Sequence, residues 1–353
     1  MLSPKGVRKI EEGAFRDCTD LTSIVIPDRV TSIERYAFQG CTGLTSIVIP
    51  DSVTEIGGDA FSGCTGLTSI EIPDSVTEIG SGAFAGCAGL TNIKVAEGNK
   101  VYDSRNNCNA IIESKTNSLI SGCKSTEIPE GVTEIGVAAF SGCTGLTSIV
   151  IPEGVTVIGE DAFRDCTSLT SIKVAEGNKV YDSRNNCNAI IKRETNTLIS
   201  GCKSTVIPNS VTVIGCDAFL GCSSLKSIEI PDSVTEIGSG AFSGCTGLTN
   251  IAIPDSVTCI GWNTFKGCTG LISVVIPKGV TEILDFTFGY CTSLKEVTLP
   301  VGVKKIDEEA FEGCNALERI YVPAKKADYY KKRLPEELHD KIVELQPEKK
   351  TKK

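Results

Sequence analysis

Cysteine has the greatest capacity for chemistry in this sequence, and it accounts for 17 of the 353 residues. Thiolates ligate metals and attack electrophiles, and two thiols can form a disulfide. The C-x-x-C spacing that is typical of zinc ribbons occurs nowhere in the chain. Eleven cysteines share one position, three residues after a recurring phenylalanine: Cys18, Cys41, Cys64, Cys87, Cys143, Cys166, Cys222, Cys245, Cys268, Cys291 and Cys314. This spacing indicates a structural repeat.

The eleven thiols are predicted to form a buried ladder. Stacked repeats would place equivalent sulfurs about 4.8 Å apart with parallel side chains, a geometry that suits a disulfide poorly. A buried cysteine then acts as a small apolar residue that fills a tight corner. The number and spacing of the cysteines in the whole chain favour a reducing or anaerobic setting. The remaining cysteines are less regular, and pairing stays open for Cys108 with Cys123 and for Cys187 with Cys202, beside the isolated Cys216 and Cys259.

Carboxylates also recur, in the string V-T-E-I-G, at Glu55, Glu78, Glu134 and Glu236. A row of acids can mimic a paired-carboxylate site, but duplication of a solvent-facing strand position explains it. Other repeats hold a different residue at the same position: Val157, Val213 and Cys259. The single histidine of the chain, His339, leaves the repeat cysteines and serines without a base. We therefore predict no catalytic residue and no enzymatic activity.

The asparagine-rich segments around Asp103 and Asp182 are the remaining places where a metal could bind. Calcium needs several converging oxygens, whereas asparagine-rich turns mostly satisfy their own backbone. The glycines occur in G-C-T-G-L corners, which is not the pattern of a phosphate-binding loop. We predict no metal and no cofactor, with calcium at these two turns left open.

The charge balance narrows the classes of partner. Lys and Arg number 35 against 44 Asp and Glu, a net charge of −9 that argues against nucleic-acid binding. No run approaches the roughly 20 apolar residues of a membrane span. The opening residues MLSPKGVRKI contain no apolar signal-peptide region, and Pro4 already lies inside a repeat. We expect either a fragment of a longer protein or a chain whose leader has been removed.

A 23-residue repeat organises almost the whole chain. Its marker is Ala-Phe or a close variant, and the spacing between markers is 23 residues except for two gaps of 56. Each gap holds an insertion of 33 residues, and both insertions contain KVAEGNKVYDSRNNCNAII. Such a period indicates a solenoid. The marker phenylalanines are Phe15, Phe38, Phe61, Phe84, Phe140, Phe163, Phe219, Phe242, Phe265, Phe288 and Phe311.

Each repeat is predicted to be one coil. In the unit at residues 49–73, Leu67-x-x-Ile70-x-Ile72 predicts a strand that sends both isoleucines into the core and Glu71 outward. Pro73 and the polar residues after it predict the turn that ends this strand. A second short strand is expected on the opposite side of the coil, followed by a 3₁₀ turn at Ala-Phe. One coil can bury its apolar face only against its neighbours.

The consensus V-T-x-I-G-x-x-A-F-x-G-C-x-x-L-x-x-I-x-I-P resembles the BspA-like leucine-rich repeat family of bacterial surface proteins. The insertions are similar to a variant module of that family, and IYVPAKKADYYKKRLPEELHDKIVEL from Ile320 is similar to its C-terminal helical cap. The resemblance covers residues 4 to about 345. It implies a right-handed solenoid with a role in adhesion or host contact and a cell-surface or secreted location. A cytoplasmic location is the alternative.

The predicted fold is an α/β repeat, mainly β: a leucine-rich-repeat solenoid of about 13 coils, which at about 4.8 Å per coil would be about 60 Å long. Eleven coils carry the Ala-Phe marker and two are modified. Insertions near 95–128 and 174–207 each predict a modified coil and a hairpin. We expect residues 1–323 to form the solenoid, 324–345 a helical cap and 346–353 a charged disordered tail.

The cap is predicted to contain two helical segments, the first from Ala327 to Tyr330. The second begins at Pro335, which suits a helix start, and His339 is expected on its surface. Its apolar residues recur at helical spacing: Leu334, Leu338, Ile342 and Leu345.

The position that varies between repeats is the outward position of the main strand, ten residues after each marker phenylalanine. Core positions barely change, whereas this one holds aliphatic, acidic, basic and aromatic side chains: Val25, Val48, Glu71, Lys94, Val150, Lys173, Glu229, Ala252, Val275, Thr298 and Tyr321. We call these positions the sheet face and take all but Ala252 and Thr298 as candidate protein-binding residues. Valine suits strands whether or not anything binds, which is an equal alternative explanation.

The predicted function is a non-enzymatic protein-binding or adhesion module of a bacterial surface protein, acting as a monomer. Its partner would be a protein, with host extracellular-matrix and cell-surface proteins as candidates. A purely structural spacer within a larger surface protein is the alternative. If the sheet face does not bind, the hairpins around Tyr102 and Tyr181 are the next candidates, because we expect them to project and to carry an aromatic residue.

Overall fold

The structure is a computed structural model that describes residues 6–346 of the chain. It consists of two compact units, Met1–Asp182 and Ser183–Lys353, and each is described by itself. The expected disordered tail lies outside the described residues from 347 onward. The predicted boundaries between solenoid, cap and tail stay predictions.

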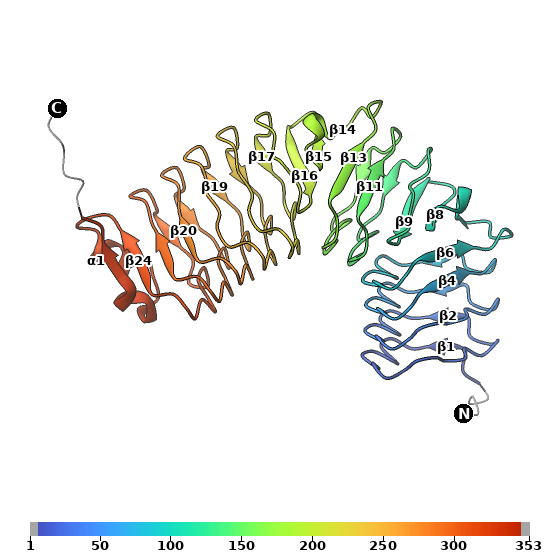
Figure 1. The fold of residues 1–353 in the computed structure, drawn as a ribbon. Coiled ribbons are helices and arrows are strands. Elements are labelled where there is room, and N and C mark those ends of the chain that lie inside the picture. Colours follow the sequence, from blue (N-terminus) through green and yellow to red (C-terminus); the bar gives the residue numbers. More distant parts are fainter. Residues whose placement is uncertain (1–5, 347–353) are drawn as a thin grey trace. The chain divides into compact units, whose positions relative to one another are not determined.

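Coils of the first unit place a two-residue strand on one side and a longer extended segment on the other (Figure 1). The short strands form a parallel sheet in the order β1 (Lys9–Ile10), β2 (Ser32–Ile33), β3 (Glu55–Ile56) and β5 (Glu78–Ile79). The longer strands pair as β4 (Ser69–Ile72) with β6 (Asn92–Val95), and as β11 (Ser148–Ile151) with β13 (Ser171–Val174). Ser32 pairs with Glu55 and Glu55 with Glu78, so these strands are offset by one repeat.

The first insertion adds antiparallel strands to the short-strand side. The strands β7 (Tyr102–Asp103), β8 (Ala110–Glu113) and β9 (Ser118–Gly122) follow one another, and the 3₁₀ helix η1 (Arg105–Asn107) joins the first two. β9 then pairs in parallel with β10 (Glu134–Ile135), which pairs with β12 (Val157–Ile158). The hairpin predicted for this insertion is confirmed. The strand β14 (Tyr181–Asp182) begins the second insertion and ends this unit.

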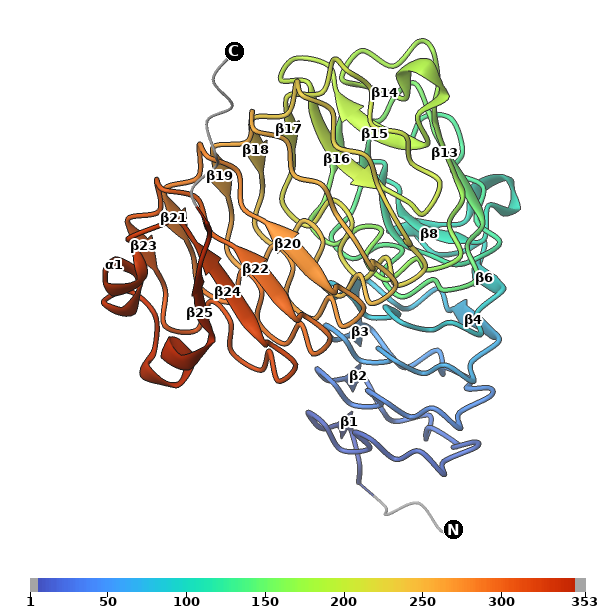
Figure 2. The same ribbon diagram turned by 60° about the vertical axis from the view of Figure 1, so that its left-hand side comes forward.

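The second unit repeats the same plan. After η2 (Arg184–Asn186), β15 (Ala189–Lys192) is antiparallel to β16 (Thr197–Gly201), and the parallel strands β17 (Val213–Ile214), β18 (Glu236–Ile237) and β19 (Cys259–Ile260) follow. The pair β21 (Glu282–Ile283) and β23 (Lys305–Ile306) lies further along. On the other side β20 (Ser273–Val275), β22 (Glu296–Thr298), β24 (Arg319–Val322) and β25 (Ile342–Glu344) form a parallel sheet, side by side in Figure 2.

A column of stacked phenylalanine rings runs through the core of each unit. Neighbouring ring centroids lie 5.1–5.6 Å apart and the rings are within 9° of parallel. The backbone sets this spacing, since the Phe38 N–H donates to Ala60 O at 2.7 Å in the next coil. The modified coil of the first insertion has a glycine against the next ring: a Cβ on Gly122 would lie 2.3 Å from a carbon of Phe140. Glycine is therefore required there to keep the coil spacing.

The predicted burial of the thiol ladder is confirmed for ten of its eleven members, and Cys18, in the first described coil, is exposed. Eight of the ten also donate a hydrogen bond to the carbonyl of the phenylalanine one coil back. Cys268 Sγ, for example, lies 3.1 Å from Phe242 O. A thiol is both a small hydrophobe and a weak donor. Cysteine at this position therefore fills the corner and satisfies an inward-facing carbonyl.

The number of turns differs from the prediction, being about 15 and not 13. The eleven Ala-Phe units are set by the sequence, so the excess falls in segments that lack this marker. These segments are the two insertions, which contribute extra antiparallel strands, and the cap, whose strand β25 adds one more rung to the sheet.

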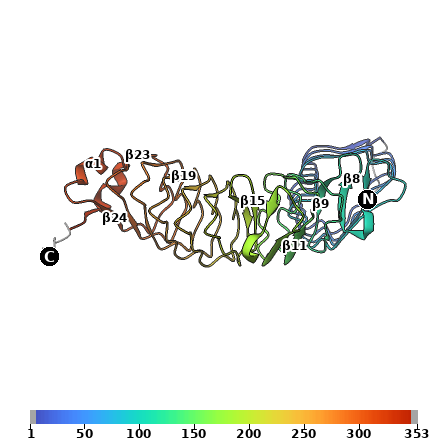
Figure 3. The same cartoon turned by 90° about the horizontal axis from the view of Figure 1, so that it is seen from above.

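The prediction of a second cap helix running to Leu345 is wrong. The helix α1 (Ala327–Lys331) is present beside β24 at the C-terminal end, as Figure 3 shows, and a 3₁₀ helix η3 (Glu336–Lys341) follows Pro335. Ile342 then enters β25, which pairs with β24. Without β25, the outer edge of β24 would present a row of unpaired backbone N–H and C=O groups. A strand at residues 342–344 pairs with these groups, whereas a helix would not.

Replacing Phe242 by alanine is expected to lower the free energy of unfolding by about 3–5 kcal/mol, because the ring is fully buried between Phe219 and Phe265. Coils contact only their neighbours, so amide exchange should rise in residues 219–288 and stay slow further away. Hydrogen exchange followed by mass spectrometry measures this. Equal loss of protection along the whole second unit would contradict the nearest-neighbour picture.

The stability of the fold should decrease at alkaline pH because of the thiol ladder. Burial raises the pKa of Cys64, Cys143 and Cys268 to about 12, whereas an unfolded cysteine titrates near about 8.5. The folded state holds these protons more tightly, so their contribution is complete below about pH 8.5 and is lost as the pH rises toward 12. Urea unfolding between about pH 8 and pH 11 is expected to show a decreasing free energy of unfolding.

At neutral pH a thiol reagent should label the exposed Cys18, Cys216 and Cys259 first and the buried thiols only after denaturation.

Candidate functional site

The sheet face of the first unit carries exposed side chains, because strand alternation turns every second residue outward. Four of its six positions are Val25, Val48, Glu71 and Lys94, and Val25 and Val48 are 90% and 78% exposed on adjacent rungs joined by a parallel bridge. Lys94 Nζ lies 3.1 Å from Glu71 Oε1 in an exposed ion pair. The face therefore begins with two neighbouring valines and continues with a charged pair.

Beyond the first insertion the same unit places Val150 opposite Lys173 in the β11–β13 pair. Val150 is 55% exposed and Lys173 is exposed. No strand is assigned at residues 126–129, between β6 and β11, so the paired strands of this face are interrupted at the modified coil.

In the second unit, Glu229 and Val275 are exposed, the valine at 63%, and Tyr321 is half-buried. The Tyr321 hydroxyl donates to Glu296 Oε1 at 3.2 Å, and Arg319 donates to the same oxygen at 2.9 Å. Tyr321 is therefore part of a local polar cluster, whereas Val275 presents an unpaired aliphatic surface.

Two outward residues were missed in the sequence because the modified coils have no Ala-Phe marker. The Ile-Pro pair that ends most of these strands also occurs in the modified coils and places Glu127 and Val206 at the outward position. Val206 is 71% exposed and Glu127 is exposed. The Ile-Pro pair therefore identifies two outward positions that the Ala-Phe marker misses.

The insertion hairpins do not present their tyrosines, contrary to the expectation for them. Tyr102 and Tyr181 are 5% and 6% exposed. The Ile79 N–H donates to the Tyr102 hydroxyl at 2.9 Å, which ties the insertion to the coil before it. The two tyrosines therefore anchor the insertions and are not available to a partner.

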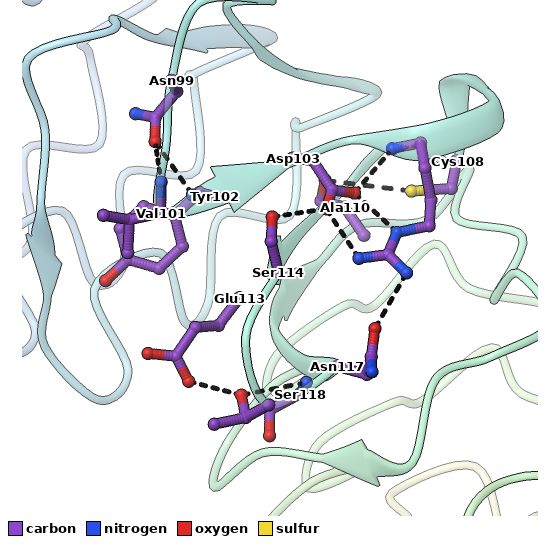
Figure 4. A network of polar contacts seen from close by, with 12 residues as sticks. Asn99, Val101, Tyr102, Asp103, Cys108, Ala110, Glu113, Ser114, Asn117 and Ser118 are labelled. Atoms are coloured by element: carbon purple, nitrogen blue, oxygen red, sulfur yellow. Dashed lines mark hydrogen bonds and ion pairs between the residues drawn. The ribbon is translucent and has the colours of Figure 1, made fainter.

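An asparagine, also missed in the sequence, anchors each insertion. Asn99 donates to the carbonyls of Pro73 and Val76 at 2.8 and 2.9 Å, and its Oδ1 accepts from the N–H groups of Val101 and Tyr102 (Figure 4). Its copy Asn178 makes the same contacts and is 1% exposed. The repeated string E-G-N-K was the available signal.

The carboxylate considered for calcium is held by an arginine. Arg105 donates to both oxygens of Asp103 at 2.7 and 2.6 Å and to Asn117 Oδ1 at 2.9 Å, and Ser114 also donates to Asp103 (Figure 4). Burial by itself raises the pKa of Asp103, but the hydrogen bonds from Arg105 and Ser114 outweigh it and keep the pKa below the ordinary value. A guanidinium in this place opposes a cation, and the network stabilises the hairpin.

Within the described residues one group of carboxylates has its oxygens within 4.8 Å of one another: Asp285, Asp307 and Glu309. A hydrogen bond with Asp285 raises the pKa of Glu309 above its ordinary value. The neighbouring carboxylates disfavour the charged form of Glu309.

The family model for the BspA type leucine rich repeat region (6 copies) matches residues 3–111, 110–200 and 190–318. The chain belongs to the BspA-type leucine-rich repeat family. The resemblance seen in the consensus is confirmed, and the modified coils of this leucine-rich repeat protein fall inside the matched ranges.

Solved structures support the same assignment. A leucine rich cell surface protein from Faecalibacterium prausnitzii A2-165 is 35% identical with a TM-score of 0.64, covering 92% of this chain and 85% of that one. A leucine-rich repeat protein from Eubacterium ventriosum is 26% identical with a TM-score of 0.52, covering 83% and 79%. The pneumococcal vaccine antigen PcpA, at 20% identity and a TM-score of 0.54 over 96% and 85%, shares the fold. A comparison with curated proteins gives no match.

The Arg105→Ala variant is expected to lower the free energy of unfolding by about 1–3 kcal/mol, because Asp103 and Asn117 each lose a charge-assisted partner. Arg164→Ala is the matched control, since Arg164 is exposed and among the described residues pairs only with the half-buried Asp161 and Asp165, and its effect should stay within about 0.5 kcal/mol. Urea unfolding measures both. Equal effects of the two substitutions would show that the hairpin network adds nothing beyond a surface ion pair.

Proposed function

We propose that this chain is a non-enzymatic binding module of a bacterial surface protein and that it contacts a protein partner through the sheet face. The observation that carries the proposal is the contrast in residue type between the buried and the exposed positions of each coil. Buried positions keep one residue type from coil to coil, whereas the exposed position beside them changes character. Core packing explains the constant residues but does not select the outward ones.

The exposed valines give the proposal its energetic basis. Val25, Val48, Val150 and Val275 are all more than half exposed. Covering such side chains releases about 25 cal/mol for each Å² of apolar area, and the charged residues between them can select among partners. An extended face of this kind suits a macromolecule.

A surface location and a matrix or cell-surface partner are part of the same proposal. The relative from F. prausnitzii is described as a cell surface protein. In residues 6–346 no helix is long and apolar enough to cross a bilayer. The partner is a protein, with host extracellular-matrix proteins as first candidates, and the module acts as a monomer. A cytoplasmic location is the alternative.

A structural spacer is the second candidate function. Each coil is tied to the next by ring stacking, by Cys–Phe carbonyl bonds and by threonine ladders, as where Thr54 donates to Thr31 O at 3.2 Å. Such continuous contacts favour a stiff element that holds another domain away from a surface. A spacer would not depend on which residues occupy the sheet face, whereas a binding module would. Substitutions in the sheet face therefore distinguish the two candidate functions.

The combined substitution of Val48, Val150 and Val275 by aspartate is expected to weaken adhesion to immobilised host matrix proteins by at least about tenfold, or about 1.4 kcal/mol. Each side chain points away from the core, so the thermal midpoint should change little. Surface plasmon resonance against a panel of matrix proteins measures the binding.

The matched control replaces Val137 and Val157 by aspartate. Both are about half exposed and lie outside the sheet face, and Val157 occupies a position that is Glu in other coils. The control should bind like the parent chain. If the sheet-face variant folds and binds as before, that face is not the contact surface and the spacer function gains support.

A further inference from the structure

The negative charge of this chain is concentrated in the first unit. Residues 1–182 contain 14 Lys and Arg against 24 Asp and Glu, a net charge of −10. Residues 183–353 contain 21 basic and 20 acidic residues, a net charge of +1. The two units share one repeat, so the repeat itself does not require this difference.

The imbalance is sharpest in the coils that carry Val48. Between Arg35 and Lys94 the sequence has no Lys or Arg, and it has six Asp and Glu. Among the described residues, Glu71 is the one of these six acids that has an ion-pair partner, Lys94. An acidic stretch of this length raises the local concentration of cations and cationic segments around it.

Acids line the corner that borders the sheet face. The residue after the strand-ending proline or its equivalent is acidic in four successive coils, at Asp28, Asp51, Asp74 and Glu97, and all four are exposed. The same position is Glu in the three coils that follow in this unit. No basic side chain of the described residues lies within ion-pair distance of Asp51 or Asp74.

The valines and these acids line one continuous groove. Two adjoining hollows of about 740 and 330 Å³ share Val48, Ile49 and Asp51. The first also contains Val25, and the second extends to Asp74. Every charged residue that lines the two hollows is acidic: Asp28, Asp51, Glu71 and Asp74.

We propose that the partner of this groove is a cationic protein segment, in which an aliphatic or aromatic side chain packs on Val25 and Val48 while Lys or Arg residues lie over Asp51 and Asp74. The proposal rests on the proposed function and names the chemistry of the partner. Charge complementarity carries it, since an acidic or neutral apolar segment would bury the aspartates without compensation.

The probe is a fluorescent synthetic peptide that alternates lysine and valine, titrated into the whole chain at low ionic strength. It is expected to bind, and a peptide that alternates glutamate and valine is not. A lysine–serine peptide should bind at least about threefold more weakly than lysine–valine, because it lacks the apolar anchor. Raising the ionic strength from about 0.05 to about 0.5 M should weaken binding several-fold, because salt screens exposed charges.

The Asp51→Asn/Asp74→Asn variant should weaken binding of the lysine–valine peptide by about tenfold, and Val48→Ser by about threefold. Asp232→Asn is the matched control, since Asp232 follows the strand-ending proline in the second unit. Asp28 is not replaced in the test variant, because the basic residue Arg29 follows it directly. Circular dichroism checks that each variant folds.

Equal binding of the lysine–serine and lysine–valine peptides, or equal losses in the test and control variants, would overturn the proposal, because general attraction to an acidic protein would then explain the result. Absence of lysine–valine binding would overturn it as well. Neither result bears on the valine-to-aspartate adhesion test, so the groove's preference for cations can fail while the sheet face remains the contact surface.

Discussion

The structure depends on one constraint: a single 23-residue coil cannot bury its own apolar face, so each coil must be covered by the next at one fixed spacing. The stacked phenylalanines show this spacing directly, with centroids 5.1–5.6 Å apart. The Phe N–H to Ala O bonds and the Cys Sγ to Phe O bonds hold it on either side of each ring. Any residue that widens one coil disturbs two contacts, which explains why buried positions keep a narrow choice of residue.

The same constraint leaves the outward positions free to vary. A side chain such as Val48 contacts solvent and the neighbouring rungs, so its replacement by Glu in the next coil, at Glu71, leaves the core untouched. Binding specificity in a solenoid can therefore change without loss of fold. Stability and recognition belong to different residues of one short strand, and alternation separates them.

Much of the architecture follows from the sequence because both periods, 23 along the chain and two along the strand, are visible in it. The inward Ile70 and Ile72 and the outward Glu71 were predicted from alternation alone, and their burial agrees. The features that these periods do not show depend on contacts between residues that are far apart in the sequence. Ile342 fits a helical pattern equally well, but the free edge of β24 makes it part of a strand. Tyr102 and Asn99 could be recognised as anchors only once the coil that accepts them was known.

The corner acids of the first unit are not explained by the turn they occupy. The same turn is made in the second unit with Lys278 and with Val301 after the proline, and Lys278 there forms an ion pair with Asp255 in the adjacent coil. The turn therefore accepts a basic or an apolar residue without losing its geometry. Like charges stacked at strand spacing repel, so an uninterrupted acidic row lowers stability relative to such alternation. Duplication can create the row, but the second unit shows that substitution readily removes it. Retention of the row beside exposed valines in one unit alone is the pattern expected of a surface selected for contact with a cationic partner.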